Sequence, residues 1–416
     1  MCGGALVDSH TEGDNLTVSE AHGYGMLILP IMAGYDKRAH ELFDGMVQYM
    51  HLHPSSKNAH LMAWFQNRMC MNEQGDDSAT DGDMDIAYGL LLADKQWGSC
   101  GKINYKKEAL EVIQAIRDST VDKDATFTLL GDWALDPENS KRDATRTSDF
   151  MTDHFRVFGQ VSGNKDWDHL VDSIYAFTEK LQLKHAPKTG MLPDFVIKPL
   201  QDPTPAPPRF LEDTTDGTYA YNACRDPWRF ATDYLMSGDP RPQRILQRMN
   251  KWLIDEHGGD PRYIYPGYTL DGRRNQRDKY YTVAFVAPLA VGAMVDPSNQ
   301  KWLDRAWDAI EFAPIEDYFE ESLRLLSMIV ISGNWWSPVG KPDPCEGKAA
   351  SGAAAPASSA APASSAAPAS SVAPSSGAAA VSSAAPASSA APATSAAAPG
   401  KPGPKAGAPA KGAAKK

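Results

Sequence analysis

Apolar residues recur at intervals of three and four positions along much of the first 346 residues, which is the spacing of a helix that buries one face. Sustained alternation of apolar and polar residues, which is typical of a half-buried strand, is scarce. The pattern therefore predicts a large helical domain. The predicted helical segments include Ile86 to Leu92, Glu108 to Arg117, Trp167 to Leu181, Trp228 to Leu235, Arg244 to Leu253, Trp302 to Ile310 and Glu321 to Val330.

Long segments rich in Gly, Pro and Asp separate these helices, at residues 131–148, 187–217 and 255–281. Connections in compact domains have a median length of about 4–6 residues, and much longer ones usually carry function. We therefore expect the helices to form a scaffold and the loops to form the site.

The composition changes sharply after position 346. Residues 347–416 contain no aromatic residue, Asp or Glu, and they repeat Ala, Pro and Ser in units such as APASS before a Lys-rich end. Such a segment cannot bury enough apolar surface to offset the entropy lost on ordering it. The sequence thus predicts one folded domain over residues 1–346 and a disordered linker or tail over residues 347–416.

Charge differs between these two parts. The tail contributes six lysines to a formal net charge of −11, so residues 1–346 carry about −17. A domain this acidic repels a phosphate backbone, which excludes nucleic acid as its partner. An acidic surface suits a cationic polysaccharide, although solubility alone explains it more simply.

The cysteines and the apolar runs exclude two further classes of protein. No CxxC spacing or paired His pattern occurs, so a zinc site is not indicated and we expect one disulfide at most. No apolar run reaches the roughly 18 residues of a membrane span. The first four residues are not a signal peptide, so the protein is either intracellular or lacks its true N-terminus. The five cysteines are Cys2, Cys70, Cys100, Cys224 and Cys345.

Three segments place acids among glycines and aromatic residues, as cleavage of a glycosidic bond requires an acid and a carboxylate. Glu20 in SEAHGYGM begins an apolar helix, where it also suits the positive helix end. Asp81 in ATDGDMDIA begins a second helix, either as a charged cap or as a sugar ligand. That segment lacks the final glutamate of an EF-hand, so calcium is not indicated. YNACRDPWR at 221–229 suits either a sugar-binding loop or a packed helix entrance.

Together the three segments resemble glycoside hydrolase family 8, in the family's order, over about residues 15 to 336. The family patterns are SEGxGYGM, ATDGDxDIA followed by LLLADxxWG, and Y[DN]xxRxPWR. Here Ala21-His22 replaces the usual Gly-Gln, and Gly89 replaces a Ser or Ala, which should change packing slightly. The resemblance implies an all-α (α/α)6 toroid, a cleft across the helix N-terminal ends, and no metal or organic cofactor.

The resemblance also implies roles for individual residues. Glu20 is then the proton donor and Asp81 the acid that holds the sugar at the cleavage subsite. The resemblance places further residues along the cleft: Trp64 as a stacking platform, Tyr318 as a stacking residue near the opposite end, Arg225 as a hydrogen-bond donor, and Asp194 and Tyr221 as lining residues.

The general base is the least obvious assignment. Many family members have Asp as the base where this chain has Asn222, and an amide cannot take a proton from water near neutral pH. A subgroup that includes chitosanases and mixed-linkage glucanases shares the Asn and uses a glutamate from the preceding loop. Glu212 matches it, ten residues upstream and just after the Pro-rich stretch 203–208. The alternatives are Asp213, Asp216 and Asp278.

The resemblance implies an endo-acting, inverting hydrolase of β-1,4 bonds in cellulose derivatives, β-1,3-1,4-glucan or chitosan, acting as a monomer. Only 19 residues precede Glu20, against about 40 in the family's layout, so we expect a missing signal peptide and first helix, and a secreted enzyme. One alternative is a carbohydrate-binding scaffold that lost catalysis with Asn222. Another is a cell-wall protein whose tail is the functional part.

Overall fold

The computed structural model describes residues 2–9, 15–72, 75–275 and 280–346. The predicted disorder of residues 347–416 therefore lies outside the described residues. Every helical segment predicted above lies within a helix of the structure, so those predictions are confirmed. The helices are α1 (Ser19–Ile31), α2 (Ala39–Leu52), α3 (Thr80–Trp97), α4 (Tyr105–Ser119), α5 (Thr152–Ser162), α6 (Asp166–His185), α7 (Asp226–Ser237), α8 (Pro240–Glu256), α9 (Val283–Ala293), α10 (Gln300–Glu311) and α11 (Tyr318–Ile331).

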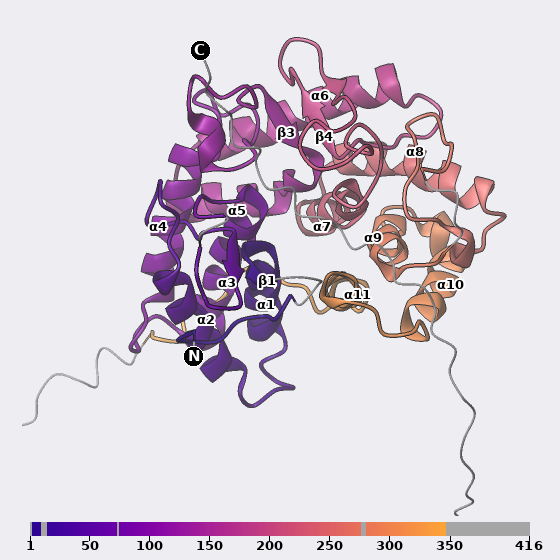
Figure 1. Cartoon of the computed structure of the whole chain (residues 1–416). Helices are drawn as coiled ribbons and strands as arrows, with labels where there is room; N and C mark the ends of the chain where they lie inside the picture. Colours follow the sequence, from indigo (N-terminus) through magenta and orange to yellow (C-terminus); the bar gives the residue numbers. More distant parts are fainter. Residues whose placement is uncertain (1, 10–14, 73–74, 276–279, 347–416) are drawn as a thin grey trace, which may run out of the picture. The chain divides into compact units, whose positions relative to one another are not determined.

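The odd-numbered helices form a closed inner ring, in which each packs against the next and α11 packs against α1. Each even-numbered helix from α2 to α10 packs on the outside of the odd-numbered helix before it (Figure 1). The sequence explains the two layers. Inner helix α9 is apolar along its length and all of its residues are buried, whereas outer helix α10 buries only one face. This arrangement is the (α/α)6 toroid that the family resemblance implied.

Small residues let α1 and α3 approach closely along their whole length. A Cβ atom at Gly82 would lie 2.4 Å from Oγ of Ser19, and one at Gly89 would lie 2.7 Å from the carbonyl oxygen of Met26. Real Cβ atoms do not approach other atoms this closely, so larger side chains would push the helices apart. The glycines therefore place the first turns of α1 and α3 side by side.

Short strands form within the long connections, where the sequence pattern did not predict them. β1 (Asn15–Val18) pairs antiparallel with β2 (Phe65–Asn67) directly before α1. β3 (Ala144–Arg146), β4 (Phe195–Ile197) and β5 (Thr204–Pro205) form a second antiparallel sheet in that order. The second sheet joins the loops 131–148 and 187–217 to each other.

Two disulfides occur, Cys2–Cys70 and Cys100–Cys345, and Cys224 is a buried free thiol. The expectation of one disulfide at most was therefore wrong. The partners are 68 and 245 positions apart, so no local spacing in the sequence reveals either pairing. Only the folding of the helical ring brings these cysteines together.

Candidate active site

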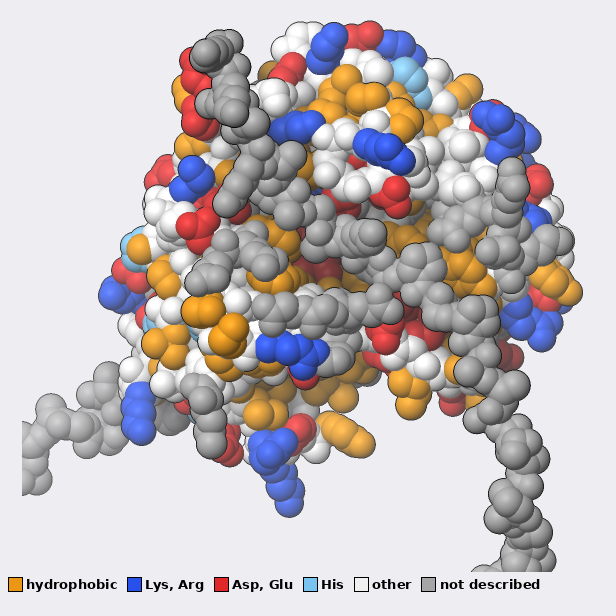
Figure 2. Space-filling model, in the orientation of Figure 1, with side chains coloured by type: hydrophobic (Ala, Val, Ile, Leu, Met, Phe, Trp, Pro, Cys, Tyr) orange, Lys and Arg blue, Asp and Glu red, His pale blue; other side chains and the backbone are white. Residues whose placement is uncertain are grey.

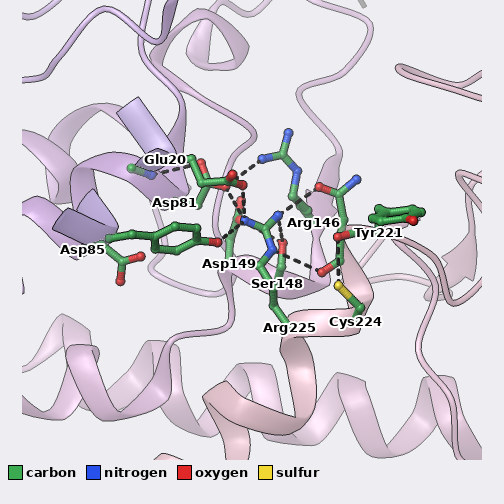
Figure 3. A network of polar contacts seen from close by, with 12 residues as sticks. Glu20, Asp81, Asp85, Arg146, Ser148, Asp149, Tyr221, Cys224 and Arg225 are labelled. Carbon is green, nitrogen blue, oxygen red and sulfur yellow. Dashed lines mark hydrogen bonds and ion pairs between the residues drawn. The ribbon is translucent and has the colours of Figure 1, made fainter. Parts of the chain in front are cut away.

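The buried guanidinium of Arg225 connects residues from four parts of the chain. Its Nη1 donates hydrogen bonds to Oε2 of Glu20 at 2.5 Å and to Oδ2 of Asp81 at 2.9 Å. Its Nη2 donates to Oγ of Ser148 at 2.9 Å and to Oδ1 of Asn222 at 3.0 Å. Arg225 is 1% exposed, and Figure 3 shows these contacts converging on it. Because a guanidinium is planar with fixed N–H directions, it sets the four groups in one arrangement.

These residues meet because the inner helices begin at the same end of the ring. Glu20 is the second residue of α1, Asp81 is the second of α3, and Tyr318 is the first of α11. Arg225 ends the short 3₁₀ segment directly before α7. In the space-filling view, acidic and hydrophobic side chains are visible near the middle of the face shown (Figure 2). The N-terminal ends of these inner helices therefore lie together, at the place where the family resemblance implied a cleft.

Glu20 has the electrostatic environment of a proton donor. Burial raises the pKa of its carboxyl above the usual value, the nearby Asp81 carboxylate raises it further, and Arg225 opposes both. Its side chain keeps 18% of its surface exposed, so a substrate can still reach it. A carboxyl that stays protonated to higher pH is what general-acid catalysis needs.

Asp81 has the opposite environment. Burial would raise the pKa of its carboxyl, but the guanidinium groups of Arg146 and Arg225 outweigh burial and hold the pKa below its usual value. The carboxylate also accepts the N–H of Gly82 at 2.9 Å. Asp81 therefore stays ionised where Glu20 is protonated, and an ionised carboxylate can accept hydrogen bonds from sugar hydroxyls.

Glu212 reaches the same network from the opposite side. Its Oε1 accepts a hydrogen bond from Nη2 of Arg146 at 3.2 Å, and Nη1 of Arg146 lies 3.4 Å from Oδ2 of Asp81. Its Oε2 accepts from Nδ2 of Asn222 at 2.8 Å. One third of the Glu212 side chain is exposed. Arg146 thus bridges the two carboxylates in the same way that Arg225 bridges Asp81 and Glu20.

The side-chain amide of Asn222 links Glu212 to Arg225. Its oxygen accepts a hydrogen bond from Arg225 and its nitrogen donates one to Glu212. Making both contacts at once needs an amide, because a carboxylate could accept from Arg225 but has no N–H to donate to Glu212. Asn222 therefore acts here as a hydrogen-bond link.

The sequence matches the family model for "Glycosyl hydrolases family 8" over residues 3–333. The chain belongs to this family. It is therefore a glycoside hydrolase, and the network of Glu20, Asp81, Glu212, Asn222 and Arg225 lies where its motifs converge.

The chain is similar to two proteins by sequence and to one solved structure, all three named as glucanases. The chain is 47% identical over 331 residues to a β-glucanase of Niallia circulans, covering 80% of each chain. It is 41% identical to an endoglucanase of Bacillus sp. strain KSM-330, covering 78% of this chain and 68% of the other. The structure of a β-1,3-1,4-glucanase from Paenibacillus sp. X4 superposes with a TM-score of 0.77 at 45% identity, covering 81% and 89%.

Trp64 and Tyr221 flank the network of this family 8 enzyme. The carbonyl oxygen of Trp64 accepts the N–H of Ser19 at 2.9 Å, so the backbone of Trp64 lies next to the start of α1, and the Trp64 residue is half-buried. The Tyr221 hydroxyl lies 2.9 Å from that of Tyr280, and its ring meets Phe285 edge to face. Trp64 and Tyr221 both remain partly exposed.

Tyr318 lies directly at Glu20. Its hydroxyl donates a hydrogen bond to Oε1 of Glu20 at 3.2 Å. Burial, followed by the Glu20 charge, raises the pKa of Tyr318 well above its usual value, so it remains a donor. The expected position near the opposite end of the cleft was therefore wrong. The reason is that Tyr318 begins α11, which packs against α1 in the closed ring.

Asp194 lies behind the network rather than on an open surface. Its Oδ1 accepts the backbone N–H groups of Ala220 at 3.0 Å and Ala223 at 2.7 Å. It is only 4% exposed, and burial raises the pKa of its carboxyl to about 7. These contacts hold the loop that carries Asn222, so the structure favours a positioning role for Asp194 over the expected lining of the cleft.

Arg146 is a functional residue that the sequence analysis missed. It lies at the end of β3, where the register places it opposite Phe195 of β4. Its guanidinium lies 5.3 Å from the Phe195 ring centre and contacts both Asp81 and Glu212. Nothing in the local sequence distinguished it from other loop arginines. The pairing of β3 with β4, which joins two distant loops, is what brings it to the site.

Among the described residues, no group of three or more His, Cys, Asp or Glu side chains is arranged to hold a metal ion. Three acidic side chains of the site differ in electrostatic environment and exposure. Glu20 offers a carboxyl group whose pKa is raised, Asp81 a carboxylate whose pKa is lowered, and Glu212 a carboxylate that solvent can reach.

Proposed function

We propose that this family 8 enzyme is an endo-acting, inverting β-glucanase in which Glu20 is the general acid and Glu212 is the general base. Glu20 would protonate the leaving glycosidic oxygen while Glu212 takes a proton from the attacking water. Asp81 would hold the sugar at the cleavage subsite. The observation that carries this proposal is the hydrogen bond from Asn222 to Glu212, which draws a carboxylate to the place where this chain has an amide.

The alternative bases are engaged elsewhere. Both carboxylate oxygens of Asp216 accept backbone N–H groups, and Asp216 is 1% exposed. The Asp213 carboxylate accepts from the N–H and hydroxyl of Thr214. Asp278 lies outside the described residues. Glu212 is thus the acid of its loop that is both partly exposed and joined to the network.

The charge balance of the site favours a neutral glucan over chitosan. Arg146 and Arg225 offset much of the negative charge of Asp81 and Glu212. An ammonium group on the substrate would therefore meet two guanidinium groups as well as the carboxylates, and would gain little. The relatives that are 47% and 45% identical are named as a β-glucanase and a β-1,3-1,4-glucanase. β-1,3-1,4-Glucan is the substrate we propose.

We also propose that the enzyme works outside the cytoplasm. Its two disulfides are of the kind that persists in oxidising compartments. Among the described residues, no helix combines the length and apolarity that crossing a bilayer would require. A polysaccharide too large to enter a cell also has to be cut outside it.

The proposed function is tested by rates on β-1,3-1,4-glucan, carboxymethylcellulose and chitosan measured in parallel. Glu212→Gln should lower kcat by about 10² or more on the preferred glucan. Asp213→Asn, next to it in the same loop, is the matched control and should stay near the parent enzyme. Glu212→Ala should regain part of its rate in azide, which can occupy the vacated space.

Two results would contradict the proposal. A Glu212→Gln enzyme within tenfold of the parent would remove Glu212 as the base. A parent enzyme that binds but cleaves none of the three polysaccharides would leave the binding scaffold as the better explanation.

A further inference from the structure

Glu212 is carried by a tightly closed turn. The N–H of Arg209 donates to the carbonyl oxygen of Asp213 at 2.7 Å, and Arg209 has a φ of +60°. Positive φ is uncommon for a residue with a side chain, so the turn is held in one specific shape. Glu212 lies between these two residues, within the closed turn.

A single buried carboxylate, that of Asp216, organises this turn. Its Oδ2 accepts the backbone N–H groups of Leu211 at 2.7 Å and Glu212 at 3.0 Å. Its Oδ1 accepts the N–H of Asp213 at 2.7 Å. Three successive N–H groups that converge on one anion fix the backbone of those residues. One of them is the backbone of Glu212 itself.

Asp216 is in turn anchored to the scaffold. Its carbonyl oxygen accepts the N–H of Phe195 at 2.9 Å, which ties it to the start of β4. The next residue is Gly217, where a Cβ atom would lie 2.1 Å from the carbonyl oxygen of Ala206. The two ends of the loop therefore touch at a point where only glycine fits. The backbone of Asp216 is thus fixed where the two ends of the loop meet, while its side chain extends to the turn that carries Glu212.

We propose that Asp216 is the positioning residue for the general base. This inference rests on the proposed function of Glu212. The Asp216 carboxylate transmits the fixed position of β4 to the backbone of Glu212, so that the Glu212 side chain meets Arg146 and Asn222 at the correct distance. Asp216 touches neither the substrate nor the reacting water, and it acts only through Glu212.

The test is a double-mutant cycle between Asp216→Asn and Glu212→Gln. Asn keeps the volume of Asp216 but turns an NH₂ group toward backbone N–H donors, which loosens the turn. Asp216→Asn alone should lower kcat by about 10–100-fold and change KM by less than about twofold. On the Glu212→Gln background it should cause no further loss, since the residue through which it acts is already removed.

Azide provides a second measurement that a merely structural role would not satisfy. The azide-supported rate of Glu212→Ala should be the same with and without Asp216→Asn, because a free anion does not depend on the turn. Asp213→Asn is the control, since its side-chain oxygen keeps the contacts to Thr214. Should Asp216→Asn fail to fold, Asp216→Ser, which keeps one acceptor, replaces it in the same cycle.

The inference is overturned if Asp216→Asn leaves kcat unchanged, or if it lowers the rate by the same factor on both backgrounds. Either result can be told apart from failure of the proposed function. If the proposed function fails, Glu212→Gln will itself remain near the parent rate, whatever residue stands at position 216.

Discussion

The side-chain amide of Asn222 lies 2.8 Å from Oε2 of Glu212, with Nδ2 donating to the carboxylate. The same amide accepts a hydrogen bond from Arg225, which also binds Glu20, the proposed proton donor. Asn222 therefore joins the proposed base to the acid through one arginine. Where many family members have an aspartate, this chain therefore has an amide that links Glu212 to Arg225.

Asn222→Asp should impair the enzyme. A second carboxylate would replace an N–H donor beside Glu212, and two like charges at hydrogen-bond distance retain one proton between them to higher pH. We expect kcat to fall about tenfold near neutral pH and the acid limb of the pH–kcat profile to move to higher pH. Asn222→Ala, which removes the link without adding charge, is the control and should move that limb less than Asn222→Asp does. Coincident acid limbs for Asp and Ala would contradict the account.

Glu20→Gln should lower kcat and raise the thermal midpoint near neutral pH. It should lower kcat by at least about 10³, the loss expected for a missing general acid. Because folding raises the pKa of Glu20, the parent protein loses stability as pH rises above the ordinary glutamic acid range, and Gln removes this loss. The thermal midpoint of Glu20→Gln should exceed that of the parent at pH 7, and the difference should shrink at pH 4. An equal difference at both pH values would show that the ionisation of Glu20 is not its cause.

Substitutions at Asp194 distinguish positioning from substrate contact. Both backbone N–H groups donate to the same oxygen, Oδ1, so Asp194→Asn can keep both hydrogen bonds. We expect Asp194→Asn to retain activity within about threefold, and Asp194→Ala, which frees two buried N–H groups, to lose about 1–3 kcal/mol of stability per group. Urea denaturation and kcat measurements on both variants check this. Equal loss of activity in both variants, with stability unchanged in both, would instead indicate direct sugar binding.

Thiol titration checks the two disulfides. The unfolded, unreduced chain should show one reactive thiol, that of Cys224. The double substitution Cys100→Ser, Cys345→Ser should lower the free energy of unfolding by about 2–5 kcal/mol, since this bond closes a very long loop. Three or five reactive thiols in the parent chain would contradict the pairing.

Local sequence was enough to predict most of the helices, and the family motifs indicated residues that the structure brings together around Arg225. Glu20 and Asp81 each begin an inner helix within a recognisable motif, and Arg225 directly precedes another, so their convergence follows from the ring. The position of Tyr318 could not be predicted, because it depends on closure of α11 against α1. Arg146 was missed for the same kind of reason, since the pairing of β3 with β4 joins segments some fifty residues apart and no local pattern reports it.

In the Glu212 loop, the sequence indicated one residue of interest, Glu212, but not the other, Asp216. Its position ten residues before Asn222 indicated the residue, and two residues of the Pro-rich stretch before it, Thr204 and Pro205, form the short strand β5. The role of Asp216 could not be read in this way. As one acid among several in a polar loop, it differs from Asp213 only in the direction of its side chain and in its burial.

The central claim is that Glu20 and Glu212 act together on a water molecule at the opposite face of the sugar ring. An acid and a base that enclose a water invert the anomeric centre, whereas an enzymatic nucleophile retains it. Proton NMR of the reducing end first formed from β-1,3-1,4-glucan measures this directly, before mutarotation equalises the anomers. The account predicts that the α-anomer appears first. Appearance of the β-anomer first would mean that a side chain attacks the sugar, and would contradict it.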